Sequence, residues 1–394
     1  MKRSFFARAA GAALLLCSLP YATVWADELV GIDSDPLLVT ARNPQDPLYA
    51  NAGANLRTGV GSIFVEFNGI PVGGFICTAS AISPRHILTA AHCVLESGDS
   101  VRRIRFVLSA GQPSPLLLDA VGFTVHPDYE FFLPFLGAFA HGDVAVIELA
   151  VDLPAGVETY ELYTGSDEFG QTARHYGHGR SGTGNKGATG PADFFYGRTG
   201  LNRYEQVLEP FLGTGIEDQL LHDFDSGGRK HNAMEWWFTS RFACHPENPN
   251  NPPQAQDGQC TTFKDGSYPD FKGFGNLETG VAPGDSGGPS FIDGKIAGVH
   301  SFGFTHFCEG VTNGTDFTCG LDSSYGEMSG DTRVSYYAGW IAGAVGNPAE
   351  RPIPELPPLA APVEPATAPA AAATNARARE FMSNTVSGTM RARF

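Results

Sequence analysis

Residues 284–289 of this 394-residue chain read Gly-Asp-Ser-Gly-Gly-Pro, and this stretch indicates both a fold and a chemistry. An unaided serine hydroxyl is a weak nucleophile, so it needs a neighbouring base to take its proton. Glycines let the backbone bend tightly and bring N–H groups up to a developing negative charge on oxygen. We therefore expect Ser286 to act as a nucleophile, with the N–H groups of Gly284 and Ser286 as oxyanion donors.

Two upstream segments supply the partners that such a serine requires. Residues 88–93 read LTAAHC and contain His92, while residues 142–146 read GDVAV and contain Asp143. An imidazole is a suitable general base near neutral pH. A buried carboxylate on its other ring nitrogen fixes the tautomer and stabilises the transient positive charge. We expect His92 to be the base and Asp143 to orient it.

Taken in order, TAAHC (89–93), GDVAVIEL (142–149) and GDSGGP (284–289) resemble the trypsin/chymotrypsin-like serine protease family. The order His, Asp, Ser differs from the orders in subtilisins and α/β-hydrolases. The resemblance covers residues 59–343. It implies an all-β fold of two packed antiparallel six-stranded Greek-key β-barrels with a short C-terminal helix, and a monomeric endopeptidase that cleaves proteins or peptides through an acyl-enzyme without a cofactor.

The residue patterns independently favour strands. The chain has 48 Gly and 28 Pro, and short apolar or alternating runs are interrupted by turn formers. Such spacing is typical of a β-barrel or a β-sandwich. Asp293-Gly294 between two apolar runs predicts a hairpin turn, and residues 334–343 predict the helix.

The ends of the chain differ in composition from its middle. Residues 1–26 have a basic start, an apolar run and a small-residue end, as in a secretory signal peptide. We interpret residues 27–58 as an N-terminal extension or pro-segment, 59–346 as the protease domain and 347–394 as a Pro/Ala-rich, disordered tail. This layout indicates a bacterial exported protein, secreted or periplasmic, and no later stretch is apolar for long enough to span a membrane.

Charge disfavours one class of partner. Residues 27–346 contain 18 Lys and Arg against 38 Asp and Glu, a net charge of −20. A surface this acidic repels phosphate backbones, so we expect no nucleic-acid partner.

Six cysteines remain after the signal peptide, which in an exported chain indicates three disulfides among fifteen possible pairings. The resemblance implies a Cys77–Cys93 bridge beside the catalytic histidine. The cysteine that usually precedes the serine motif is missing, so a Cys308–Cys319 bridge is the expected local substitute, which leaves Cys244 and Cys260.

The resemblance also assigns substrate contacts. Ser301, Phe302 and Gly303 match the segment that aligns the substrate as an added β-strand. Gly280 falls at the floor of the specificity pocket, where no acidic side chain would attract Arg or Lys. His300 lies behind that pocket; we treat it as a packed histidine, with recognition of an acidic substrate residue as the alternative.

In the family, a freed N-terminal ammonium pairs with the aspartate before the nucleophile, which is Asp285 here. The usual Ile-Val-Gly-Gly start is absent, and Leu29-Val30-Gly31 and Val60-Gly61 are weak substitutes.

No histidine or cysteine set has a metal-ligand spacing, so we expect no catalytic metal and treat His175, His178, His222 and His231 as structural. Acidic clusters in 245–258 and 313–331 leave a structural calcium site open. Two other functions also remain open: an inactive binding or adhesion protein on a protease scaffold, and a small-molecule esterase.

Overall fold

The computed structural model describes residues 38–68, 74–95, 100–132, 139–207, 217–227, 231–234, 273–305, 317–318 and 320–353. The expected signal peptide and four of the expected disulfide cysteines, Cys244, Cys260, Cys308 and Cys319, lie outside these residues. Within the described part, no helix is long and apolar enough to cross a membrane.

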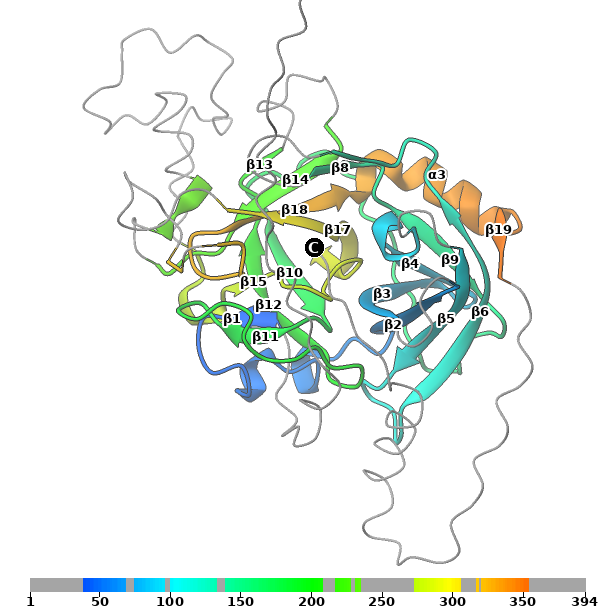
Figure 1. Ribbon diagram of the computed structural model, residues 1–394, viewed down its shortest axis with the longest axis horizontal. Helices are drawn as coiled ribbons and strands as arrows, with labels where there is room; N and C mark the ends of the chain where they lie inside the picture. Colours follow the sequence, from blue (N-terminus) through cyan, green and yellow to red (C-terminus); the bar gives the residue numbers. More distant parts are fainter. Residues whose placement is uncertain are drawn as a thin grey trace, which may run out of the picture.

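The first half of the chain forms a closed barrel in which every neighbouring pair of strands is antiparallel. Pairing of β6 with β9 closes the ring, so the six-stranded barrel expected from the sequence is confirmed. Its strands are β2 (Val60–Phe67), β3 (Phe75–Ser83), β4 (His86–Thr89), β5 (Val101–Leu108), β6 (Leu116–Val125) and β9 (Ala145–Leu149). Figure 1 shows this barrel in blue to cyan.

The interior of the first barrel is apolar. β-Branched and aromatic side chains favour its strands, and Ile63, Leu88, Phe106 and Ile147 are fully buried inside. Strand β2 is buried along its whole length because its outer face meets the second half of the chain. Phe64 contributes to that contact through an edge-to-face packing on Phe194, with ring centroids 5.5 Å apart.

The second half of the chain forms a half-barrel of seven strands in the order β12-β10-β16-β17-β18-β14-β13. These are β10 (Thr172–Gly177), β12 (Arg198–Arg203), β13 (Gln206–Val207), β14 (Gln219–Asp223), β16 (Pro289–Ile292), β17 (Lys295–Phe304) and β18 (Met328–Arg333). The mostly β fold of two barrels expected from the sequence is confirmed, with the second barrel present as a half-barrel that no strand pairing among the described residues closes. The Asn202 side chain of β12 donates to the Asp223 carbonyl of β14 at 2.6 Å.

The predicted hairpin at Asp293-Gly294 is confirmed. Ile292 of β16 pairs with Lys295 of β17, and both turn residues have positive φ, 49° and 76°. These angles match the primed turns whose twist suits a two-residue hairpin.

The segment before residue 59 is integral to the second half. Strand β1 (Leu38–Thr40) lies between β11 (Ser181–Thr183), to which it is parallel, and β15 (Thr279–Gly280), to which it is antiparallel. Tyr49 is buried and its hydroxyl donates to the Asn276 carbonyl. Short 3₁₀ turns lie at Pro47–Tyr49, Gly53–Asn55 and Gly275–Leu277. Elsewhere in the chain, β7 (Glu130–Phe132) pairs antiparallel with β8 (Phe139–His141).

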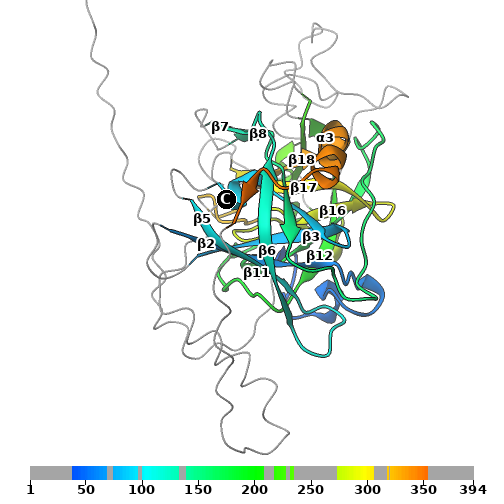
Figure 2. The ribbon, with the colours of Figure 1, turned by 90° about the vertical axis from the view of Figure 1, so that its right-hand side faces the viewer.

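The predicted C-terminal helix is present as α3 (Val334–Gly346). Tyr337 and Ile341 bury its inner face against the first barrel's core. At its start, Arg333 forms a two-pronged ion pair with buried Glu168, with N–O distances of 3.0 and 2.7 Å. Figures 1 and 2 both show the helix at the junction of the two sheets.

The folded body continues past residue 346, where the tail was expected to begin. Strand β19 (Arg351–Pro352) pairs with Phe123 and Gly122 of β6, and the Ile353 N–H donates to the Val121 carbonyl at 2.8 Å. Two residues of ladder suffice here because Ile353 also packs against the apolar core.

The pairing of β19 with β6 predicts that the stability of the protein depends on where the chain is truncated. A chain ending after Ile353 should unfold at the same temperature as the full chain. A chain ending after Gly346 loses the β19 ladder and the packing of Ile353, so we expect it to be less stable by about 1–2 kcal/mol. Thermal unfolding followed by circular dichroism measures both, and equal melting temperatures for the two truncations would contradict a structural role for β19.

Candidate active site

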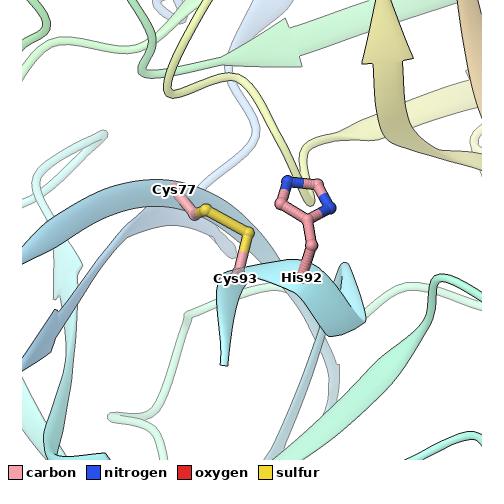
Figure 3. A group of neighbouring side chains, drawn as sticks. All are labelled: Cys77, His92 and Cys93. Carbon is pink, nitrogen blue, oxygen red and sulfur yellow. A yellow bond between two sulfur atoms is a disulfide. The ribbon is translucent and has the colours of Figure 1, made fainter. Parts of the chain in front are cut away.

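His92 lies on a single 3₁₀ turn, Ala91–Cys93, that directly follows β4. The turn is fixed by a disulfide from Cys93 to Cys77 on β3, with Cα atoms 6.2 Å apart, so the bridge expected beside the histidine is confirmed. Figure 3 shows the imidazole standing beside this disulfide. The crosslink limits the freedom of the turn that carries the ring.

Asp143 is fully buried and is held on both carboxylate oxygens. Its Oδ2 lies 2.7 Å from His92 Nδ1, and its Oδ1 accepts the His92 backbone N–H at 2.9 Å. Ser301 Oγ donates to Oδ2 at 2.5 Å. Burial raises the pKa of Asp143, but the charge of His92 and the hydrogen bonds from His92 and Ser301 outweigh it and lower the pKa below its ordinary value.

Gly142 allows the segment that carries Asp143 to pack closely against its neighbours. It has a φ of +60°, and a Cβ there would lie 2.8 Å from the backbone of Asp128 and Tyr129. Its N–H donates to the Tyr337 hydroxyl of α3 and to Asp218. A larger residue would displace the segment that presents Asp143.

The loop that carries Ser286 is fastened to the first barrel through Thr78 of β3. Thr78 N–H donates to the Ser286 carbonyl at 2.8 Å, and its hydroxyl donates to the Gly284 carbonyl at 3.0 Å. Cys93 Sγ, next in sequence to His92, lies 3.6 Å from the same Ser286 carbonyl. These contacts bring the serine loop beside the histidine turn.

Gly287 makes that contact possible. With a φ of +80°, it packs so closely that a Cβ would lie 2.4 Å from the Thr78 carbonyl oxygen and 2.9 Å from the Ala90 nitrogen. Gly284 also has positive φ, +98°. Within the described part of the chain, the N–H groups of Gly284 and Ser286 donate to no protein acceptor, as donors awaiting an oxyanion would.

The Asp285 side chain contacts the second half of the chain. Its carboxylate accepts the N–H of Gly179 at 2.7 Å and of Ala282 at 2.8 Å, and it forms no ion pair with any described residue. Burial raises the pKa of Asp285 to about 7, although His300, Arg198 and the two N–H groups act to lower it. Among the described residues, the hydrogen-bond donors to this carboxylate are therefore neutral.

The expected substrate segment lies on β17 directly after His300. Beyond Val299, β18 is the one described strand that pairs with β17. In the family that the sequence resembles, this segment receives an extended peptide as an added strand. Phe302 is buried over Gly330, and Ser301 has a second role that the sequence did not indicate, its hydrogen bond to Asp143.

Gly280 lies on β15 opposite Val39 of β1. A Cβ at this position would lie 2.8 Å from the Phe224 ring. An aromatic wall, rather than a charge, therefore adjoins the residue expected at the pocket floor.

His300 is fully buried and its Nδ1 lies 2.8 Å from Asp331 Oδ1. Burial lowers the pKa of His300, but the charge and hydrogen bond of Asp331 raise it above the ordinary value overall.

The sequence motifs did not indicate two buried aspartates near the site, Asp331 and Asp218. Asp218 accepts hydrogen bonds from His141 Nδ1 and from the Tyr337 hydroxyl, and it thereby holds the segment before Asp143 in place. Neither lies in a motif; only the sheet register brings them to the site.

Three groups of described residues have donor atoms close enough for a metal ion. The first, Cys77, His92 and Cys93, is excluded as a ligand set by its disulfide. The others are His175, His222 and Asp331, and Glu205, Asp223 and Asp225. The calcium sites suggested by the acidic clusters stay predictions. The range 245–258 lies outside the described residues. In the range 313–331, the carboxylates of Asp322 and Glu327 accept hydrogen bonds from their own loop.

Parts of the chain are similar to known proteins. The family model described as Trypsin matches residues 59–206. The serine protease Hayan of Drosophila melanogaster is 31% identical over 91 residues, which cover 22% of this chain and 13% of that protein. The solved structure of neuropsin, a serine protease expressed in the limbic system of mouse brain, aligns with 75% of this chain and 98% of its own at 15% identity and a TM-score of 0.46.

The family match contains His92 and Asp143 and ends before Ser286. The matched stretch of the fly protease is a small part of that much longer protein. Together these likenesses support the trypsin-like serine protease family, and residues 59–206 are the part of the chain in which its domain is recognised.

Proposed function

We propose that this protein is a secreted serine endopeptidase in which Ser286, His92 and Asp143 form the catalytic triad. The observation that carries the proposal is the pair of hydrogen bonds between buried Asp143 and His92, one to the ring nitrogen and one to the backbone N–H. Cys93, next to His92 in sequence, also supports the proposal: its Sγ lies 3.6 Å from the Ser286 carbonyl, and a general base must stand close to its nucleophile.

The chemistry follows from this arrangement. With Nδ1 of His92 donating to Asp143, Nε2 takes the proton of Ser286 as its oxygen attacks the peptide carbonyl. The charge of Asp143 stabilises the imidazolium, and the N–H groups of Gly284 and Ser286 receive the oxyanion, where one donor contributes about 3 kcal/mol. His92 then returns the proton to the leaving amine, and water releases the acyl group from Ser286.

Replacing the nucleophile tests this assignment. We expect Ser286→Ala to lower kcat by roughly 10⁴-fold or more, because the acyl-enzyme cannot form, and to leave the melting temperature within a few degrees of the original. The measurement is hydrolysis of a peptide substrate, with labelling by a fluorophosphonate probe. Ser290→Ala, whose hydroxyl is committed to Asp331, is the matched control for labelling.

The alternatives give different results in the same assays. A folded protein with intact Ser286 that takes up no probe would be a binding protein on a protease scaffold. Turnover of esters with no peptide cleaved would indicate an esterase.

The residue expected at the floor of the specificity pocket, Gly280, predicts which substrate residues are not preferred. Gly280 offers no carboxylate, and the neighbouring Phe224 ring is apolar, so we expect no preference for Arg or Lys at the residue before the cleaved bond. Profiling a diverse peptide library measures this. Cleavage concentrated after Arg or Lys would contradict the placement of Gly280 at the pocket floor.

We further propose that Asp285 is linked to activation and that the freed terminus is Leu38. Val60 and Gly61 are excluded as a free terminus because they lie inside β2, and Leu29–Gly31 lies outside the described residues. Leu38 is fully buried and pairs with Ser181, two residues from Gly179, whose N–H binds Asp285. The guanidinium of Arg198 binds the Leu38 carbonyl and also acts on the charge of Asp285.

The pH dependence of stability tests this link. The folded pKa of Asp285, about 7, lies above its ordinary 3.8, so the folded state holds the proton more tightly and stability falls as the pH rises through this interval. In an unprocessed Ser286→Ala background, Asp285→Asn removes that loss. We expect it to match its parent at pH 4 and to be more stable by roughly 2–4 kcal/mol at pH 8.

In the processed enzyme the effect should reverse, because the ammonium of Leu38 would hold the carboxylate charged. There, Asp285→Asn should reduce both activity and stability. N-terminal sequencing of the active form identifies the terminus. An active chain in which residue 38 is internal would overturn the link to Leu38 and leave the triad assignment untouched.

A further inference from the structure

A buried polar cluster lies inside the half-barrel, directly behind the strand that carries Ser301. Its members are His175 of β10, His222 of β14, His300 of β17 and Asp331 of β18, and each is at most 1% exposed. The His175 ring packs against both other rings, with centroids 4.6 Å from His222 and 4.9 Å from His300. Four strands thus contribute one polar side chain each to a site that is buried from bulk solvent.

Asp331 is the centre of the cluster, and most of its lone pairs are engaged. Oδ2 accepts the hydroxyls of Tyr204 at 2.6 Å and Ser290 at 2.5 Å, and Oδ1 accepts His300 Nδ1 at 2.8 Å. His222 Nε2 lies 3.7 Å from Oδ1, too far for a good hydrogen bond. The carboxylate is therefore held rigidly and still faces an imidazole nitrogen across a gap.

The imidazoles lack the partners that burial demands. Among the described residues, neither ring nitrogen of His175 has a hydrogen-bond partner, and His222 Nε2 has none. Each unpaired buried polar atom costs about 1–3 kcal/mol. The surroundings would accept apolar residues, since Ala173, Leu220 and Ala297 form a buried cluster on the same strands. Histidines at these positions point to a ligand that the chain itself does not provide.

We propose that His175, His222 and Asp331 bind one transition-metal ion of the Zn²⁺ type. Their donor atoms lie within 4.8 Å of one another, and the measured His222 to Asp331 gap of 3.7 Å is close to the ligand spacing of about 3.4 Å around a tetrahedral zinc with bonds near 2.1 Å. Two imidazoles and one carboxylate suit zinc rather than calcium or magnesium, which prefer oxygen alone.

The surrounding groups suit the same assignment. A ligating carboxylate is normally oriented by further hydrogen bonds, and Tyr204, Ser290 and His300 supply them here. Among the described residues, both ring nitrogens of buried His175 lack a hydrogen-bond partner, so the ring can offer a nitrogen to an ion. A water molecule would complete the coordination.

The ion would act as a structural brace. His175 and His222 come from β10 and β14, which are not neighbours in the sheet, so a shared ion would fix the curvature of the half-barrel where no ladder closes it. It would also support β17, because His300 binds Asp331 and the next residue, Ser301, binds Asp143. The inference does not depend on the proposed peptidase activity.

Metal content of the full-length protein tests the proposal. The wild-type chain, refolded with ZnCl₂ and dialysed against metal-free buffer, should retain about one zinc per chain by mass spectrometry. His175→Phe and His222→Phe should retain less than about a tenth of that, because each removes one ligand from the set. His86→Phe, on the first barrel beside Ser83, is the matched control and should retain zinc fully.

Two measurements on the wild-type chain keep the test independent of how the variants fold. Removing the metal with a chelator should lower the melting temperature, and ZnCl₂ should restore it. CoCl₂ in place of zinc should give the visible absorption of a tetrahedral site. A wild-type chain that holds no zinc after refolding, or folded His175→Phe and His222→Phe variants that hold as much as the wild type, would overturn the proposal.

Discussion

The negative charge of Asp143 lies at the junction of the two β-sheets, out of reach of water, and the geometry of the site depends on the donors that surround it. The first barrel supplies the His92 ring and backbone N–H, and the half-barrel supplies Ser301. Thr332 of β18 adds a hydrogen bond to the Asp143 carbonyl at 2.9 Å. Since an unpaired buried charge is strongly destabilising, the two halves cannot separate without losing this site. The contact between the sheets and the candidate active site are therefore one structure.

Three buried aspartates are each held by hydrogen-bond donors, and the direction of each pKa shift depends on whether those donors can carry charge. Asp143 and Asp331 each face a histidine that can carry positive charge, and the pKa of each falls below its ordinary value despite burial. Among the described residues, Asp285 accepts hydrogen bonds from two backbone N–H groups and from no charged group, and burial raises its pKa to about 7. Neutral donors thus hold a carboxylate in place without keeping it charged. This difference marks Asp285 as the carboxylate whose surroundings are incomplete.

Sequence patterns predict structure where the structure is local. His92, Cys93, Asp143 and Ser286 lie in short motifs, and the strands of the first barrel and the turn at Asp293 follow from patterns a few residues long. Pairings between distant short segments could not be predicted. Strands β1 and β19 carry three and two residues, too few to show a pattern, and both depend on edges formed by other parts of the chain.

The buried cluster escaped prediction for a related reason. His175, His222 and Asp331 are far apart in the chain, and no spacing rule joins them, so each histidine was interpreted as structural. Only the curl of the half-barrel makes them neighbours. A metal site built across a sheet interior has no sequence signature, in contrast to one built on a single turn.

The two β-sheets differ in how their curvature is fixed. Ladders close the first barrel on all sides, so its shape is fixed by hydrogen bonds and its interior can be filled with side chains such as Ile63 and Phe106. The half-barrel has no such closure among its described strands. Apolar contacts are non-directional and permit many curvatures, whereas a carboxylate that accepts from Tyr204, Ser290 and His300 fixes three neighbouring segments at set distances. The polar interior therefore supplies the directional restraint that the open sheet lacks, and it does so beneath the strand on which Ser301 must meet Asp143.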